Sequence, residues 1–187
     1  MKKVFFCTVC AVLLFSCNSS KSKEEAVAPV ETAVAEPVVK KEMPSEFADE
    51  KYVEIAKQEL ANLSAGDVDA WGNMYADNAV YLWNTGDSLA GKAAIDGYWR
   101  KRRTEVIDSI SFLTPVFLPI KVNVPQQPTV AAGNWVLCWY LVDAKYKKSG
   151  KRMKQWIHTD MHFDSNDKVD RVIQYLDRSL VATAEKK

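Results

Sequence analysis

Beyond residue 45, the first part of the chain carries apolar residues at the period of an α-helix. Val53, Ala56, Leu60 and Leu63 recur every three or four positions, so they share one helical face. Ser45 precedes this stripe and is a suitable N-cap. The pattern predicts three helices, at residues 46–64, 68–75 and 91–103.

After Val106 the pattern changes to that of β-strands. Apolar residues alternate with polar ones or form short continuous runs, and turn residues separate the runs. Pro125 and Pro128 restrict residues 120–130 to an edge strand or a loop. Strands are predicted at residues 79–83, 107–118, 134–146, 152–163 and 169–180. Helices followed by an antiparallel sheet indicate the α+β class.

Residues 1–16 are predicted to be a signal peptide. Lys2 and Lys3 precede an apolar run that is shorter than the roughly 20 residues of a membrane-spanning helix and fits a secretory leader. The run ends at Leu14-Phe15-Ser16-Cys17, which resembles a bacterial lipobox. This resemblance implies cleavage before Cys17 and acylation of its thiol. A conventional signal peptide cut nearby, or a short anchor helix, is the alternative.

Residues 17–45 are predicted to tether the domain to the membrane. The segment after Cys17 is rich in Ala, Val, Glu, Lys and Pro and has no aromatic residue, so it buries too little apolar surface to offset its ordering entropy. The domain itself is expected to span residues 46–182, followed by a tail at 183–187. The anchor implies a place in the cell envelope. Asn18 favours the outer membrane, because an Asp there retains some bacterial lipoproteins at the inner membrane.

Charge and cysteine content narrow the function further. Without the leader, the chain has 23 basic and 24 acidic residues, so no overall field attracts nucleic acid. The basic run at residues 100–103 suits the end of a helix. Loss of Cys7 and Cys10 and acylation of Cys17 would leave Cys138 alone, without a disulfide. Because phosphate-binding glycine loops, zinc spacings and serine nucleophile motifs are missing, no cofactor, metal or nucleic-acid partner is expected.

Five short motifs follow one another along the predicted domain. They are Leu63–Trp71 (LSAGDVDAW), Tyr75–Val80 (YADNAV), Gly91–Ile95 (GKAAI), Met161–Phe163 (MHF) and Asp167–Arg171 (DKVDR). In order and spacing this series resembles the SnoaL-like and ketosteroid-isomerase-like domains of the nuclear transport factor 2-like superfamily. The resemblance implies three N-terminal helices packed on a strongly curved, mixed or antiparallel sheet. Such a cone encloses an apolar pocket.

The resemblance also implies positions for catalytic groups. The general base of the steroid isomerases falls on Trp83, their tyrosine on Glu59, and their protonated aspartate on Thr159. All three residues differ, so isomerisation by that mechanism is not expected. Glu59 lies at the edge of its apolar stripe and is expected to be a solvated carboxylate. If it were buried, its pKa would rise and it would become a candidate acid or base, with Thr159 as a polar positioning group.

Alternation along residues 152–163 divides the side chains between the two faces of the sheet. The inner face and the helices are expected to supply the ligand pocket, lined by Tyr75, Trp83, Trp99, Tyr140, Met161 and Phe163. The outer face is expected to carry Trp135, Trp139, His158, Asp160 and His162. A sheet face this apolar predicts a homodimer interface. A metal site in the His-x-Asp-x-His segment would need a well-placed third ligand, which is not evident.

Three functions therefore remain open. The first is a membrane-anchored lipoprotein whose cone binds a small apolar ligand or acts as a non-catalytic interaction module. The second is an isomerase, cyclase or hydratase that uses Glu59 and Thr159. The third is a structural envelope protein that binds partners through its outer sheet face. A buried Glu59 beside an open pocket would favour the enzyme, and a filled cone with exposed Trp135 and Trp139 would favour the structural role.

Overall fold

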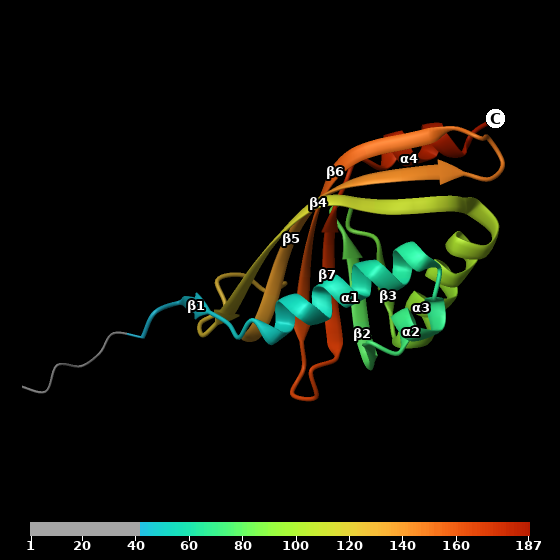
Figure 1. Cartoon of the computed structure of the whole chain (residues 1–187). Coiled ribbons are helices and arrows are strands. Elements are labelled where there is room, and N and C mark those ends of the chain that lie inside the picture. Colours follow the sequence, from blue (N-terminus) through green and yellow to red (C-terminus); the bar gives the residue numbers. More distant parts are fainter. Residues whose placement is uncertain (1–41) are drawn as a thin grey trace, which may run out of the picture. The chain divides into compact units, whose positions relative to one another are not determined.

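The computed structural model describes residues 42–187, drawn in colour in Figure 1. The elements are β1 Ser45–Phe47, α1 Lys51–Ala65, α2 Val68–Gly72, β2 Tyr75–Trp83, β3 Ser88–Ala90, α3 Lys92–Lys101, a π-helical turn at Arg102–Val106, β4 Ile107–Val122, β5 Gly133–Tyr146, β6 Arg152–Phe163, β7 Val169–Tyr175 and α4 Arg178–Glu185. The predicted signal peptide, Cys17 and most of the tether lie outside the described residues. No helix of the described part is long and apolar enough to cross a membrane.

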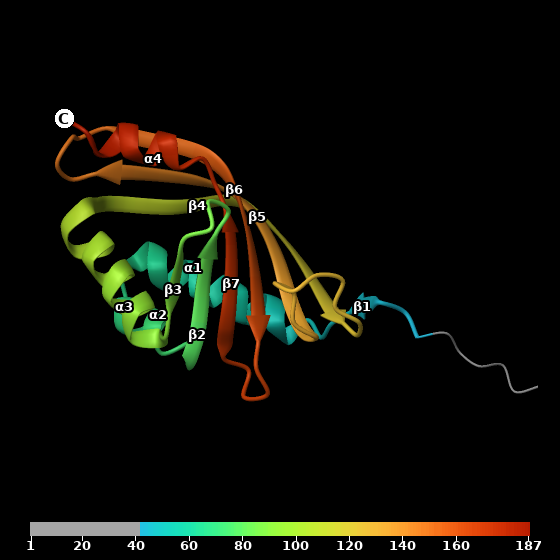
Figure 2. The ribbon, with the colours of Figure 1, turned by 180° about the vertical axis from the view of Figure 1, so that it is seen from behind.

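The strands form one mixed sheet in the order β1-β4-β5-β6-β7-β2-β3. Only β2 and β7 pair in parallel, and the other neighbours are antiparallel. The long strands β4, β5 and β6 curve strongly, and α1, α2 and α3 lie on the inner side of the curve (Figures 1 and 2). This arrangement confirms the predicted α+β class and the three helices packed on a curved sheet.

The core lies between the helices and the inner face of the sheet. Val136, Cys138 and Tyr140 of β5 and Met161 and Phe163 of β6 are all buried there. They occupy alternate positions, as the two-residue period requires. The predicted division between inner and outer faces is therefore confirmed for β5 and β6. Cys138 is a free buried thiol, and its burial raises its pKa.

The start of the first helix differs from the prediction. Ser45 begins β1, which pairs with the end of β4 opposite Val122, so it cannot be the N-cap of a helix. The helix α1 begins at Lys51, whose backbone N–H donates to the Asp49 carboxylate at 2.8 Å. Pairing of the backbone with an open sheet edge outweighs the weak helical preference of these residues.

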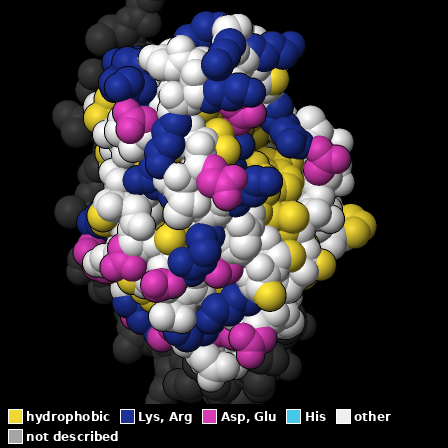
Figure 3. Space-filling view, turned by 90° about the vertical axis from the view of Figure 1, so that its right-hand side faces the viewer, with side chains coloured by type: hydrophobic (Ala, Val, Ile, Leu, Met, Phe, Trp, Pro, Cys, Tyr) yellow, Lys and Arg dark blue, Asp and Glu magenta, His cyan; other side chains and the backbone are white. Residues whose placement is uncertain are grey.

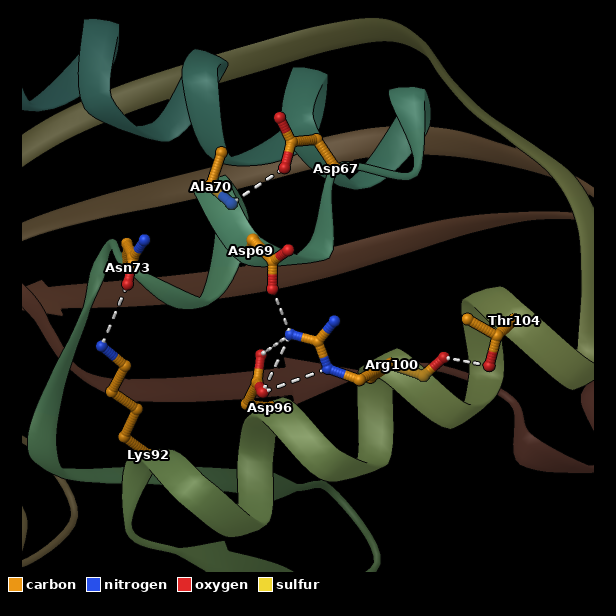
Figure 4. Close-up of polar contacts among 8 residues, drawn as sticks. All are labelled: Asp67, Asp69, Ala70, Asn73, Lys92, Asp96, Arg100 and Thr104. Carbon is orange, nitrogen blue, oxygen red and sulfur yellow. Dashed lines mark hydrogen bonds and ion pairs between the residues drawn. The ribbon is translucent and has the colours of Figure 1, made fainter.

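The connections that follow α1 agree with the sequence. Gly66 ends the helix in the left-handed conformation, at a φ of 82°. Asp67 then caps α2 by accepting the Ala70 N–H at 2.9 Å (Figure 4). Arg100 of α3 ties the helices together, because its Nη2 lies 2.6 Å from Asp69 Oδ1 of α2 (Figure 4). Because both side chains are exposed to solvent, this pair contributes little to stability.

Two strands end differently from their predicted bounds. The strand β4 passes through Pro115 to Val122 by means of a bulge, where Thr114 adopts a φ of 46°. Pro119 also lies within β4, and the loop after Val122 accommodates Pro125 and Pro128. At the C-terminus, β7 ends at Tyr175 and residues 178–185 form α4, a segment that the sequence analysis divided between the last strand and a tail. Asp177 caps this helix by accepting the Ser179 N–H at 2.8 Å.

Candidate functional site

A cavity of ≈ 300 Å³ lies where α3, α4 and the β5–β6 hairpin approach one another. Figure 3 shows this end of the domain, with apolar side chains among Lys, Arg, Asp and Glu side chains. The apolar wall comes mainly from the inner face of β4, β5 and β6. It includes Ile107, Ile110, Phe112, Val142, Ala144, Met153 and Ile157. The volume is at the small end of the range for ligand pockets.

Charged residues border one side of the cavity. Arg102, at the C-terminal end of α3, forms an ion pair with Glu185 of α4 at 2.9 Å, and its guanidinium lies 5.6 Å from the centre of the Tyr98 ring. Arg178 lies 5.3 Å from the centre of the Trp83 ring and pairs with Asp87. Arg102 is the more enclosed of the two, with a side chain 16% exposed against 41% for Arg178.

A chain of hydrogen bonds leads from the cavity wall into the core. Trp83 Nε1 donates to Gln174 Oε1 at 3.3 Å, and both residues line the cavity. Gln174 Nε2 donates to Thr159 Oγ1 at 3.4 Å, and this hydroxyl lies 2.6 Å from that of Tyr140. Thr159 therefore does not line the cavity but is linked to it through one side chain. Burial raises the pKa of Tyr140, which keeps this phenol protonated.

Glu59 is buried, so the expectation of a solvated carboxylate is wrong. Its side chain accepts from Trp71 Nε1 at 2.5 Å and from the Tyr75 hydroxyl at 3.1 Å. Burial raises its pKa from 4.5 to about 7, although the two donors act in the opposite direction. Glu59 lies at the edge of the apolar stripe of α1, and it is buried because α2 and β2 pack over that edge. Glu59 is not among the residues that line the cavity.

The predicted pocket residues divide into two groups. Trp83 and Trp99 line the cavity. The other four are buried but fill the interior of the cone away from the cavity: Tyr75, Tyr140, Met161 and Phe163. Aromatic packing closes that region, with ring centres 4.8 Å apart for Tyr52 and Phe163. The sequence predicts the inner face correctly, but it does not show which part of that face remains unfilled.

The sequence pattern does not identify the charged residues of the cavity. It places Arg102 in a basic run at the end of a helix, Arg178 in the last predicted strand and Glu185 in the predicted tail. A signal for α4 was present, because Asp177 precedes a segment with Leu180 and Val181 at its centre and is a good N-cap.

On the outer face of the sheet, His158, Asp160 and His162 of β6 belong to two separate pairs. His158 Nε2 lies 2.7 Å from Asp160 Oδ1, and the imidazole lies between the rings of Trp139 and Tyr175. His162 Nδ1 lies 2.5 Å from Asp170 Oδ1 of β7. Among residues 42–187, no group of three His, Cys, Asp or Glu side chains could hold a metal ion together.

The exposed part of the outer face differs from the prediction. Trp135 is only 3% exposed, because the loop after β4 covers it and accepts its indole N–H at Ala131 O, 2.9 Å away. Trp135 is therefore not part of an exposed surface, whereas Trp139 is 37% exposed. Several apolar residues remain exposed and form what we term the outer apolar patch: Leu113, Val116, Trp139, Trp156 and Tyr175.

Comparisons with known proteins agree with this architecture. A family model for the SnoaL-like domain matches residues 56–172. A search among curated proteins finds no match. The fold is similar to that of an NTF2-like protein from Burkholderia xenovorans LB400, with a TM-score of 0.55, 19% identity, and coverage of 75% of this chain and 100% of that one.

Two further solved structures of similar fold carry names that refer to reactions. One is an LEH-like epoxide hydrolase of M. tuberculosis, with a TM-score of 0.52, 14% identity, and coverage of 72% of this chain and 89% of that one. The other is SalBIII, an epoxide hydrolase/cyclase-like enzyme in pyran ring formation in the polyether salinomycin. Its TM-score is 0.52 at 19% identity, with coverage of 70% of this chain and 93% of that one. At these identities the similarity shows the fold alone.

Proposed function

The chain belongs to the SnoaL-like domain family, and on this basis we propose that it is a membrane-anchored lipoprotein whose cone binds a small, mainly apolar ligand. The anchor is the acylated Cys17, which precedes the tether at residues 18–45 and holds the domain in the cell envelope, at the outer membrane. This part of the proposal rests on the lipobox-like sequence at residues 14–17.

The observation that carries the binding function is the cavity beside α3 and α4. Its wall is apolar on the side of the sheet, and it has a few polar groups at defined positions. Pockets that bind small molecules usually combine these two features. The interior around Tyr52 and Phe163 is filled by packed side chains, so the ligand is expected at the end of the domain that holds the cavity.

The first prediction concerns occupancy of the cavity. A native mass spectrum of the protein, expressed from the full-length sequence and purified from its host, is expected to show a stoichiometric small-molecule adduct. Ala144→Phe should abolish the adduct, because Ala144 lines the cavity and the new ring would fill it. Ala93→Phe is the control, since Ala93 is exposed on α3 and does not line the cavity. The same sample, denatured, should lack residues 1–16 and carry acyl mass on Cys17.

An adduct that persists in Ala144→Phe would show that the small molecule binds elsewhere. A wild-type spectrum without any adduct would contradict the ligand-binding function and shift the weight to an interaction module. An unmodified Cys17 would contradict the anchor alone.

We also propose that the domain forms a homodimer through the outer apolar patch. Trp156 is 59% exposed and Val116 56%, and the patch runs across neighbouring strands of the sheet. An apolar surface of this kind favours self-association. Trp156→Glu is expected to convert dimer to monomer in sedimentation velocity experiments. Leu180→Glu, on α4, changes an equally apolar exposed residue outside the patch and should leave the mass unchanged. A wild-type monomer at micromolar concentration would disprove the proposal.

An enzyme is the second candidate, and the buried Glu59 favours it. A carboxyl group with a pKa of about 7 suits general acid–base chemistry near neutral pH. However, Glu59 does not line the cavity, and Trp71 and Tyr75 already occupy its carboxylate. Catalysis would require these side chains to move, whereas binding in the cavity leaves the hydrogen bonds of Glu59 intact. We therefore place the binding function first.

A further inference from the structure

The cavity is lined by more basic than acidic residues. Arg102 and Arg178 line it together with a single acidic residue, Glu185, so the lining carries a formal charge of +1. Asp87, the partner of Arg178, does not line the cavity. A neutral apolar ligand would make no use of these guanidinium groups, which are costly to enclose.

Arg102 is placed to receive an anion from within the cavity. Its side chain is mostly enclosed, it lies against the Tyr98 ring, and it is near the hydroxyl of Tyr146. Its carboxylate partner, Glu185, comes from the last turn of the C-terminal helix and is 38% exposed. The ion pair therefore joins a fixed arginine to a carboxylate that has access to solvent.

A second donor lies one helical turn before this arginine. Trp99 is 9% exposed and lines the cavity, and its buried indole Nε1 has no acceptor in the described part of the chain. Trp99 lies in the last turn of α3 and Arg102 begins the π-helical turn that follows, and both line the cavity. An unsatisfied indole N–H and a guanidinium group on the wall of one cavity are donors suited to the oxygen atoms of a carboxylate.

We infer that the ligand is an apolar monocarboxylate whose carboxylate displaces Glu185 from Arg102, while its apolar body lies against the inner face of β4, β5 and β6. This inference rests on the proposed binding function and adds the chemical class of the ligand. Glu185 occupies the anion position in the absence of ligand, so α4 competes with the ligand for Arg102. The helix is attached nearby by a hydrogen bond of 2.5 Å from Ser149 Oγ to Ala184 O, which keeps Glu185 close to the cavity after displacement.

The test compares an acid with an uncharged molecule of nearly the same shape. Isothermal titration calorimetry is carried out at pH 7 with 4-phenylbutyrate and with 4-phenylbutan-1-ol. The protein is the full-length chain in lipid nanodiscs, with empty nanodiscs as the blank. The wild type should bind the acid at least about tenfold more tightly than the alcohol, because only the acid forms charge-assisted hydrogen bonds with Arg102.

Three variants separate the contributions. Arg102→Gln should reduce the affinity for the acid by about tenfold or more, to the level of the alcohol. Glu185→Gln removes the competing carboxylate and should strengthen binding of the acid by about threefold or more without changing that of the alcohol. Arg100→Gln is the control on the same helix, because Arg100 pairs with Asp69 and Asp96 and does not line the cavity. It should leave both affinities unchanged.

Equal binding of acid and alcohol by the wild type would overturn the inference and leave the proposed binding function intact. The same conclusion follows if Glu185→Gln has no effect on the acid, a result that does not depend on whether Arg102→Gln folds. If neither molecule binds to the wild type or to Glu185→Gln, the inference is wrong. If the native spectrum then also shows no adduct, the binding function fails with it.

Discussion

Replacement of Glu59 by Gln is expected to make the protein more stable than the wild type above pH 7, and to leave it almost equally stable near pH 4.5. The carboxyl group has a pKa of about 7 in the folded protein against 4.5 for an unperturbed glutamate, because burial disfavours its charge. This difference of about 2.5 pH units corresponds to about 3 kcal/mol in the free energy of unfolding. Glutamine keeps an oxygen that accepts from Trp71 and never ionises.

The wild type loses stability as the pH rises because its folded state binds the proton of Glu59 more tightly than its unfolded state. Below pH 4.5 Glu59 is protonated in both states, and its contribution to stability is fully present. Between pH 4.5 and 7 it ionises in the unfolded chain first, so stability is lost as the pH rises. Above pH 7 it is ionised in both states, and the loss no longer grows.

Urea unfolding of both proteins from pH 4 to 8 measures this effect as the difference between their free energies of unfolding. Glu54→Gln is the matched control, because Glu54 lies on the same helix with a side chain 71% exposed. Its difference from the wild type should stay within about 0.5 kcal/mol across the range. A flat difference for Glu59→Gln would show that the pKa of Glu59 is the same in the folded and unfolded protein, so that its two donors offset the effect of burial.

The contrast between Glu59 and Thr159 shows what a sequence pattern can establish. Strand alternation places Thr159 on the same face as Phe163, and the family resemblance implies that this face points inward, where Thr159 is indeed buried. A residue at the edge of a helical stripe is ambiguous, because the width of the buried face depends on what packs beside it. Trp71 and Tyr75 provide both the cover and the donors for Glu59, and their approach is a tertiary feature.

The cavity was predictable in kind but not in position. The family resemblance implies a cone with an apolar pocket, and two of the six predicted lining residues, Trp83 and Trp99, do line one. The other four lie where aromatic side chains fill the cone, and such filling depends on the volumes of many residues together. The C-terminal helix α4 supplies Arg178 and Glu185 to the cavity. Because the pattern predicts a strand that continues to residue 180, it does not predict this helix or the charged residues that it brings to the site.

The largest single loss of stability is expected for Trp71→Ala. Trp71 is fully buried, its ring centre lies 4.5 Å from that of Tyr75 and 5.9 Å from that of Trp99, and its N–H donates to Glu59. Truncation of such a residue leaves a cavity and typically costs about 3–5 kcal/mol. Phe47→Ala is the control, since Phe47 is 79% exposed, and it should cost about 0.5 kcal/mol or less. Chemical denaturation at pH 7 gives both values.

Trp71→Phe separates the packing of Trp71 from its hydrogen bond. Phenylalanine retains much of the aromatic contact with Tyr75 but removes the N–H that Glu59 accepts, so the expected loss is smaller, about 1–3 kcal/mol. The indole N–H lowers the pKa of Glu59, so its removal should raise that pKa further. The free energy of unfolding of Trp71→Phe, compared with that of Glu59→Gln, should therefore continue to fall up to a higher pH than it does for the wild type. If Trp71→Phe lowered the free energy of unfolding as much as Trp71→Ala, the hydrogen bond to Glu59 would account for most of the stabilisation that Trp71 provides. A loss close to zero would mean that the hydrogen bond from Tyr75 is sufficient to hold the buried Glu59.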